Sequence, residues 1–280
     1  MNIKTVGIVG AGQMGGGIAQ VCVHAGYSVL LYDLSPGIVR HTMKKININL
    51  SKQVDTVSRI KEAKDYQDFF QCDLVIEAVT EDMDIKVEIL RELSGHLHEK
   101  ALLASNTSSL SITSLAAHSP APQRFMGIHF MNPVPEMGLV EVIRGLLTDD
   151  AAIAIVRAFI SRLNKRAILA NDFPAFIVNR ILLLMVNEAI YTLHEGVGDI
   201  RSIDNALRYG AHHPMGPLQL ADFIGLDTCL AVMRALHQEL ADSKYRPCPL
   251  LVKYVEAGWL GKKSGRGFYD YSQSPPVPTR

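Results

Sequence analysis

Two residues, His129 and Glu141, have the types and spacing of a proton-transfer pair. His129 follows the largely apolar run 125–128, and Glu141 lies twelve residues later inside a second apolar run. Histidine side chains titrate near neutrality, so an imidazole can take up and release a proton. A carboxylate beside it orients the ring and stabilises its charged form. The same spacing also fits a buried structural histidine and a glutamate that faces the solvent.

A glycine-rich turn near the start of the chain points to a nucleotide. The apolar residues 5–9 lead into Gly10-x-Gly12-x-x-Gly15, and helical residues follow. Gly10 allows the tight turn, Gly12 lets the backbone approach a pyrophosphate, and Gly15 lets the helix pack closely on the strand. The first N–H groups of the helix and its partial positive charge would face the phosphates. The predicted phosphate-binding residues are Gly10, Ala11, Gly12, Gln13, Met14 and Gly15.

An acidic residue, Asp33, ends the second apolar run, 28–32, eighteen residues after Gly15. An acid at about this distance accepts hydrogen bonds from the ribose hydroxyls of the adenosine and repels a 2′-phosphate, so we expect NAD rather than NADP. The alternative is a buried strand–turn–helix in which the aspartate is a helix cap. With NAD bound, His129 would remove the proton of a hydroxyl group as hydride leaves the carbon that bears this hydroxyl.

The first 170 residues alternate between strand and helix patterns, which indicates an α/β fold. Short apolar runs typical of buried strands lie at 5–9, 28–32, 74–79, 101–105, 125–130, 139–143 and 166–170. Helical patterns lie near 13–25, 36–50, 83–96, 111–117 and 150–164. Such alternation predicts a doubly wound, mostly parallel sheet of Rossmann type with helices on both faces.

Two of these strands, 125–130 and 139–143, are joined only by a loop around Asn132-Pro133-Val134-Pro135. The loop is too short for a crossover helix, so the pair should be antiparallel. His129 and Glu141 could then meet across the pair, at the edge of the sheet where ligands bind.

Polar side chains also end two other strands. The segment 105–109 holds hydroxyls and an amide, which could polarise a carbonyl or cap the next helix. Glu77 and Glu81 come at the end of the strand 74–79, at the edge of the sheet that should carry ligands, but they could equally be ordinary loop acids.

The alternation of strand and helix patterns ends at residues 171–174, and helical patterns follow. We expect a nucleotide-binding domain over 1–172 and an all-helical domain for substrate binding and dimerisation over 173–280. The first helix of the second domain, 174–195, is apolar on most of its circumference, with Pro174 in its first turn and Asp172 as its cap. Because so small a domain cannot cover such a helix on all sides, we expect a homodimer packed through it. The proline-rich tail, 274–278, is expected to be loose.

Composition excludes several classes of partner. The 280 residues carry 28 basic and 28 acidic side chains, so no overall field favours nucleic acid or an anionic membrane. The longest apolar run, 176–193, is interrupted by polar and charged residues, which excludes a membrane span. The four cysteines show no metal-ligand spacing and no signal peptide is visible. We therefore expect no metal, reduced thiols and a cytoplasmic protein.

Several segments together identify a family, over nearly the whole chain. They are 9–15, 73–79, 104–110, 127–135, 139–143, 176–180, 213–217, 225–227 and 261–269. In this order and spacing the chain resembles the L-3-hydroxyacyl-CoA dehydrogenases, and most closely the bacterial 3-hydroxybutyryl-CoA dehydrogenases. The resemblance implies hydride transfer between NAD and C3 of a short-chain 3-hydroxyacyl-CoA, in fatty acid metabolism.

The resemblance also implies roles for single residues. His129 resembles the catalytic base and Glu141 its partner. Ser108 resembles the hydroxyl that contacts substrate and nicotinamide, and Asn179 resembles the amide that helps to position the substrate oxygen. Positions near the cofactor are implied for Ser108, Glu81, Lys86, Asn132 and Lys263.

The chain departs from the family in the region 44–65, which is shorter than in typical relatives, where it helps to hold the CoA nucleotide. Lys44, Lys45 and Lys52 could still meet the CoA phosphates, or they could form a solvated helix face. Gly138 stands where a lysine is common. Two alternatives therefore stay open: an NAD-dependent dehydrogenase of a free hydroxy acid, and a catalytically silent, NAD-binding structural protein.

Overall fold

A computed structural model describes residues 2–49 and 58–279 of the chain. Contacts within the chain divide it into two compact units, Met1–Phe173 and Pro174–Arg280. The boundary that we expected from the sequence, after residue 172, is one residue earlier.

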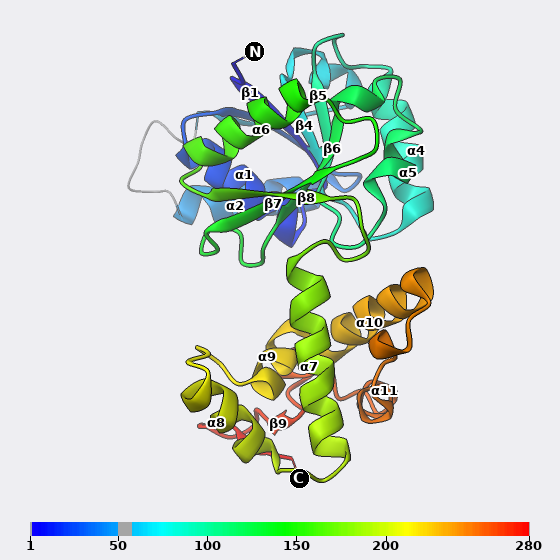
Figure 1. Ribbon diagram of the computed structural model, residues 1–280. Helices are drawn as coiled ribbons and strands as arrows, with labels where there is room; N and C mark the ends of the chain where they lie inside the picture. Colours follow the sequence, from blue (N-terminus) through cyan, green and yellow to red (C-terminus); the bar gives the residue numbers. More distant parts are fainter. Residues whose placement is uncertain (1, 50–57, 280) are drawn as a thin grey trace. The chain divides into compact units, whose positions relative to one another are not determined.

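The described part of the first unit is built on a sheet whose strands follow the order β3-β2-β1-β4-β5-β6-β7-β8 (Figure 1). The strands are β1 (Thr5–Val9), β2 (Ser28–Tyr32), β3 (Ile60–Glu62), β4 (Leu74–Glu77), β5 (Leu102–Ser105), β6 (Phe125–Phe130), β7 (Leu139–Arg144) and β8 (Arg166–Asn171). Neighbours from β3 to β6 are parallel, β7 is antiparallel to β6, and β8 is parallel to β7. The predicted Rossmann-type sheet and its antiparallel pair are confirmed. The carboxyl ends of β1, β4, β5 and β6 therefore share one edge, where such sheets bind ligands.

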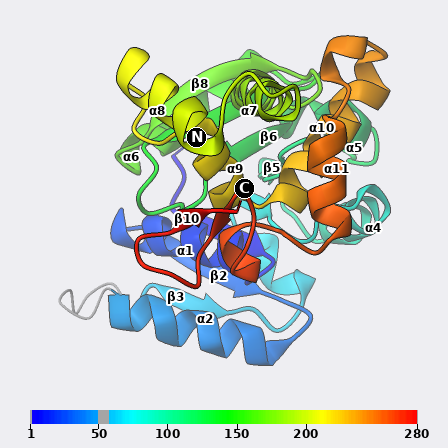
Figure 2. The same ribbon diagram turned by 90° about the horizontal axis from the view of Figure 1, so that it is seen from below.

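Helices cover both faces of this sheet. α1 (Gln13–His24), α2 (Pro36–Asn49) and α6 (Asp150–Arg162) lie on one face, and α4 (Met83–Ser94) and α5 (Ile112–Ala116) lie on the other (Figure 1, Figure 2). Val6 and Ile8 of β1 join the core that includes α1. Gly7 points to the other face, where an added Cβ would lie 2.4 Å from the ring of Phe69. Both faces of the central strands are thus buried, as their short apolar runs predicted.

The sequence did not predict β3, which lies at the edge of the sheet beside β2. Its residues are Ile60, Lys61 and Glu62, of which only Ile60 is buried. A three-residue strand with one apolar side chain offers no periodic pattern to detect.

The second unit is mainly helical, as expected, but it is not all-helical, because β9 (Tyr269–Asp270) and β10 (Val277–Pro278) form a two-stranded sheet. Its helices are α7 (Val178–His194), α8 (Ile200–Gly210), α9 (Pro217–Ile224), α10 (Leu226–Leu240) and α11 (Pro249–Glu256). They enclose an apolar core that includes Leu183, Met233 and Leu251. α7 begins at residue 178 and not at 174, because Ala175 and Phe176 have left-handed backbones, with φ of 58° and 54°, that a helix cannot continue. None of the described helices is long and apolar enough to cross a membrane.

Asp172 does not cap α7, contrary to the expectation from sequence. Its carboxylate accepts hydrogen bonds from Ser111 Oγ, Ile112 N and Thr113 N at 2.9, 2.9 and 2.7 Å. It therefore satisfies the free N–H groups at the start of α5. From the sequence we assigned Asp172 to α7 because this helix comes next in the chain. In the folded protein, the end of β8 lies beside α5.

The tail is held in place and is not loose. β10 (Val277–Pro278) pairs antiparallel with β9 (Tyr269–Asp270). The buried Asp222 fixes the segment before β9, because its carboxylate accepts from Phe268 N at 2.9 Å and Tyr269 N at 2.8 Å. An added Cβ at Gly261 or Gly267 would lie within 2.3 or 1.9 Å of Asp222. Gly261 thus allows a close approach to the main chain of Asp222, and Gly267 allows a close approach to its carboxylate.

Candidate active site

His129 and Glu141 lie opposite each other in the β6–β7 ladder and are joined by a hydrogen bond. His129 Nδ1 is 2.7 Å from Glu141 Oε2, and the two residues are 7% and 0% exposed. All six residues of β6 and the centre of β7 are buried, so the pair is enclosed on both strands. A buried carboxylate needs a polar partner, and the imidazole provides it. The predicted contact across the antiparallel pair is confirmed.

The glycine-rich turn has the shape that a pyrophosphate requires. Gly10 has a φ of +101°, and an added Cβ would lie 2.5 Å from the main-chain oxygen of residue 78. A Cβ on Gly15 would lie 1.8 Å from Gly10 O, so α1 packs directly against the turn. Around Gly12, the described residues place no atom within 4 Å of an added Cβ, apart from its neighbours in the chain, and α1 has no acidic residue in its first turn. The open side of the turn and the positive end of α1 therefore fit phosphate oxygens.

Two polar contacts connect this turn to its surroundings. Asp33, which follows β2, accepts hydrogen bonds from Ala11 N at 2.9 Å and Ser35 N at 3.0 Å, so its carboxylate lies beside the glycines. Gln13 Nε2 donates to Asn132 Oδ1 at 3.0 Å, which ties the start of α1 to the loop between β6 and β7. The structure thus brings the predicted residues Asp33, Gln13 and Asn132 to one edge of the sheet.

Glu81 organises the loop after β5. Its Oε1 accepts from Thr107 Oγ1 at 2.6 Å, from Ser108 N at 2.8 Å, and from Ser108 Oγ, Ser109 N and Ser109 Oγ at 3.1 Å each. Burial acts to raise the pKa of Glu81, but the Lys86 ammonium and the hydrogen bonds from Thr107 and Ser108 outweigh burial and hold this pKa below its usual value. A charged carboxylate therefore fixes the main chain and the hydroxyl of Ser108.

Lys86 is buried between two carboxylates. Its side chain is 1% exposed, and Nζ lies 2.7 Å from Glu77 Oε1 and 3.6 Å from Glu81 Oε2. Glu77 is fully buried at the end of β4, and its Oε2 also accepts from Ser105 Oγ at 2.6 Å. Of the two interpretations of Glu77 from sequence, the ordinary loop acid is therefore wrong.

Two of the three lysines predicted to meet CoA belong to α2. Lys44 and Lys45 are exposed on this helix, and Lys52 lies outside the described residues. Among residues 2–49 and 58–279, no group of three or more histidines, cysteines or acids is placed to hold a metal ion.

Two predicted site residues belong to the second unit. Asn179 stands in the first turn of α7 and is half-buried. Lys263 forms an ion pair with Asp227, at 2.6 Å.

The sequence matches two family profiles in tandem. Residues 5–173 match the NAD binding domain of 3-hydroxyacyl-CoA dehydrogenase, and residues 176–271 match its C-terminal domain. The chain belongs to the 3-hydroxyacyl-CoA dehydrogenase family. The first match also makes NAD the cofactor of this dehydrogenase, in agreement with the open glycine turn and the acid beside it.

Individual relatives agree with the profiles. The 3-hydroxybutyryl-CoA dehydrogenase of Bradyrhizobium diazoefficiens is 57% identical over 289 residues, which cover 99% of this chain and 99% of that protein. The human mitochondrial hydroxyacyl-coenzyme A dehydrogenase is 37% identical over 287 residues, 96% of this chain and 91% of that protein. The crystal structure of (S)-3-hydroxybutyryl-CoA dehydrogenase from Ralstonia eutropha has a TM-score of 0.94 at 47% identity, covering 97% of this chain and 100% of that one.

Asn106 supports the dehydrogenase site but was not singled out from the sequence. Its Oδ1 accepts a hydrogen bond from Phe130 N at 2.9 Å, next to His129. The contact joins the end of β5 to the end of β6. The sequence indicated Asn106 only through its place in the polar segment 105–109. Which side chain of this segment contacts the neighbouring strand cannot be decided until that strand is known.

Lys165 was also missed. Its Nζ donates to Val134 O and Met137 O at 2.6 Å each, and so it fixes the loop that carries Asn132. Burial lowers the pKa of Lys165 below its ordinary value. A lone lysine just before an edge strand gives no sign in the sequence that it is buried.

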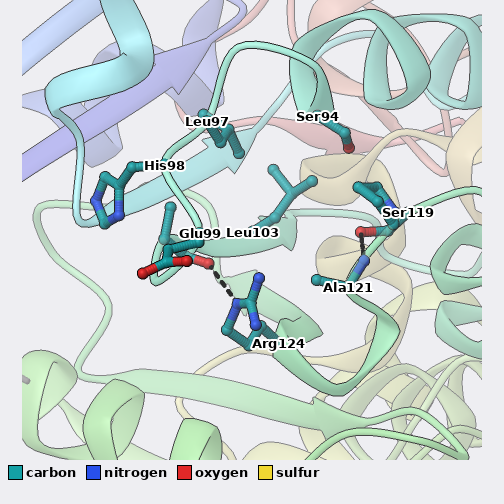
Figure 3. Close-up of a pocket in the computed structure, with 10 residues that line it drawn as sticks. Ser94, Leu97, His98, Glu99, Leu103, Ser119, Ala121 and Arg124 are labelled. Carbon is teal, nitrogen blue, oxygen red and sulfur yellow. Dashed lines mark hydrogen bonds between the residues drawn. The ribbon is translucent and has the colours of Figure 1, made fainter.

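A separate hollow lies at the opposite edge of the sheet of the first unit (Figure 3). It has a volume of about 220 Å³, and Leu103, Ser119 and Arg124 lie in its lining, where β5 and β6 begin. Arg124 Nε donates to Ala101 O at 3.2 Å (Figure 3). None of the predicted site residues that the structure describes lines this hollow, and parallel sheets bind ligands at the carboxyl ends of their strands. The active site of the dehydrogenase is therefore built elsewhere.

Proposed function

We propose that the chain interconverts 3-hydroxybutyryl-CoA and acetoacetyl-CoA, or a similar short-chain pair, with NAD as the redox partner. The observation that carries the proposal is the buried His129–Glu141 pair at the carboxyl end of β6, the edge that also holds the glycine turn. The choice of substrate is supported by the names of relatives at 57% and 47% identity.

In the direction of oxidation, the O–H bond at C3 breaks and its proton passes to Nε2 of His129, while the electron pair of the C3–H bond leaves with its hydrogen as hydride. The glycine turn and Asp33 would hold NAD, which would supply the acceptor for this hydride. Glu141 holds Nδ1, which directs Nε2 to the substrate, and its charge stabilises the imidazolium that forms. The C3 oxygen becomes a carbonyl oxygen, and Ser108, whose main-chain N and hydroxyl are held by Glu81, would lie beside it.

The other predicted residues have supporting roles in this proposal. Asn179 helps to position the substrate oxygen. Residues near the cofactor are Ser108, Glu81, Lys86, Asn132 and Lys263, and those that meet the CoA phosphates are Lys44, Lys45 and Lys52. The hydrogen bonds from Ser108 to Glu81 and from Gln13 to Asn132 support the first of these groups.

We also propose a cytoplasmic homodimer that acts in fatty acid metabolism. Ile177 and Ile181, at the start of α7, are 39% and 67% exposed, which supports pairing through the second unit. Size-exclusion chromatography with light scattering tests the dimer, and a monomer at micromolar concentration would exclude it.

The reaction is tested by following NADH absorbance with acetoacetyl-CoA and with free acetoacetate, side by side. We expect turnover of the CoA ester and little turnover of the free acid. Preferential turnover of the free acid would favour the second candidate function, a dehydrogenase of free hydroxy acids. One observation favours that candidate: Gly138 stands where a lysine is common in the family. No turnover of either substrate would favour a silent NAD-binding protein.

A further inference from the structure

We propose that Glu77 is a positioning residue for this reaction: acting through Lys86 and Glu81, it holds Ser108 in place for the substrate. The inference rests on the proposed function, which assigns Ser108 to the substrate oxygen. It is carried by a continuous series of contacts from the end of β4 to the loop after β5.

The first contacts are those of Glu77 itself, which is 0% exposed and has partners on both carboxylate oxygens. Oε1 accepts from Lys86 Nζ at 2.7 Å, and Oε2 accepts from Ser105 Oγ at 2.6 Å. The main-chain oxygen of Glu77 accepts from Asn106 N at 2.8 Å. One residue thus ties the end of β4 to the end of β5, immediately before the loop that carries Ser108.

The second step depends on charge. Glu77 Oε1 and Glu81 Oε2 lie 2.7 and 3.6 Å from Lys86 Nζ, so two carboxylates share one buried ammonium. A buried charge must be compensated, and the ammonium is compensated mainly by its closer partner, Glu77. Without the charge of Glu77, the ammonium would draw Glu81 toward itself.

In the third step, Lys86 and Ser108 compete for the carboxylate of Glu81. Its Oε1 holds Ser108 through the main-chain N at 2.8 Å and the hydroxyl at 3.1 Å. A carboxylate that moves toward Lys86 loses these bonds, and Ser108 is released. Because reacting groups must be placed to within a fraction of an ångström, the reaction slows even though no residue that contacts the substrate has been changed.

The test is the isosteric variant Glu77→Gln, with Asp73→Asn as its matched control. Asp73 comes directly before the first residue of β4, at the end of the strand far from Glu77. Its carboxylate accepts from Lys4 N at 2.7 Å and Thr5 N at 3.0 Å. We expect Glu77→Gln to lower kcat for acetoacetyl-CoA reduction by about tenfold or more, with the Kd for NADH within about twofold of wild type. Asp73→Asn should leave kcat unchanged. An unchanged kcat in Glu77→Gln would overturn the proposal.

A double-mutant cycle separates positioning from a purely structural role. In a Ser108→Ala background, Glu77→Gln should lower kcat by less than about twofold, because the residue that it positions is already gone. A full additional loss in that background would mean that Glu77 acts on the fold and not through Ser108.

If Glu77→Gln folds poorly, a second variant tests the proposal. Glu77→Gln/Lys86→Met removes both buried charges, so its Tm should recover. At saturating NADH its kcat should also rise above that of Glu77→Gln, because no ammonium is left to draw Glu81 away from Ser108. A recovered Tm with kcat as low as in Glu77→Gln would overturn the proposed action through Lys86 and Glu81.

A crystal structure of Glu77→Gln provides a readout that does not depend on the substrate. We expect Glu81 in direct contact with Lys86 and without its bonds to Ser108. Wild-type protein that turns over only the free acid would overturn the proposed substrate, and the cycle would then be run on that acid. Wild-type protein without any turnover would overturn the proposed function, while unchanged Glu81–Ser108 bonds in the variant would overturn the role of Glu77.

Discussion

Glu141 Oε2 lies 2.7 Å from Nδ1 of His129, directly across the β6–β7 ladder. An ionised carboxylate only accepts hydrogen bonds, so Nδ1 carries a hydrogen and Nε2 is the nitrogen that exchanges a proton with the substrate. Because both residues are set in buried strands, the backbone ladder fixes the ring before any ligand arrives. The pair therefore orients the base without a mobile loop.

Removal of either partner should slow the chemical step. We expect His129→Ala and Glu141→Ala to lower kcat by on the order of 10²-fold or more, the range for general acid–base catalysis. NADH binding, measured by fluorescence titration, should be nearly unchanged, because neither side chain lies at the glycine turn. The isosteric Glu141→Gln is the matched variant, since it keeps the size of the side chain but cannot stabilise an imidazolium. Near-wild-type turnover in either alanine variant would mean that the residue is misassigned.

Cofactor preference should depend on Asp33, whose carboxylate accepts from Ala11 N beside the glycine turn. A 2′-phosphate would lie against this charge, so kcat/KM should be much higher with NADH than with NADPH. Asp33→Ala should narrow the difference, whereas Asp150→Asn, at an exposed acid that begins α6, should not change it. Equal efficiency of the wild type with both cofactors would refute the role of Asp33 at the ribose.

Local patterns predicted the parts of the fold and site that depend on neighbouring residues. The glycine turn needs only three positions, and the central strands show as short apolar runs because both of their faces are buried. The short connection around residues 132–135 was equally informative. It excludes a crossover, so it fixes the antiparallel pair, and with that pair the contact between His129 and Glu141 follows.

Contacts between segments far apart in the chain could not be predicted. Asp172 caps α5 across sixty residues, and its own neighbour in sequence suggested a different helix. Glu77 is an acid at the end of an apolar strand, and nothing in its spacing shows that Lys86 and Ser105 will enclose it. Single side chains in tertiary contacts give no periodic pattern in the sequence. Their contact partners can be assigned only once the order of the strands in the sheet is known.

The affinity for CoA should depend on the lysines of the shortened region. Exposed Lys–phosphate contacts are weakened by salt, and Lys44 and Lys45 are exposed on α2. We expect Lys44→Ala/Lys45→Ala/Lys52→Ala to raise KM for acetoacetyl-CoA several-fold with little change in kcat, and to flatten the salt dependence of KM. Loss of affinity without loss of turnover indicates uniform binding of substrate and transition state. Lys100→Ala, before β5 at the opposite edge, is the control, and an unchanged KM in the triple variant would place CoA elsewhere.

Stability should depend on pH through Asp222, the carboxylate that holds the segment before β9. Burial raises its pKa from 3.8 to about 6, and the hydrogen bonds from Phe268 N, Tyr269 N and Tyr271 OH offset only part of this effect. Between these two values the folded protein keeps a proton on Asp222 that the unfolded chain has lost. The contribution of this group to the free energy of unfolding therefore falls as pH rises from about 4 to about 6, by about 3 kcal/mol in total.

Chemical denaturation of the wild type and Asp222→Asn at several pH values measures this contribution. The free energy of unfolding of the wild type minus that of the variant should decrease from pH about 4 to about 6 and level off above. Asp227→Asn is a control of opposite sign. Burial acts to raise the pKa of Asp227, but the hydrogen bonds from Lys263 and Thr228 N hold it below its usual value, so this contribution is lost as pH falls. A difference for Asp222→Asn that stays constant or grows between pH about 4 and 6 would mean that this buried carboxyl ionises at least as easily in the folded protein as in the unfolded chain.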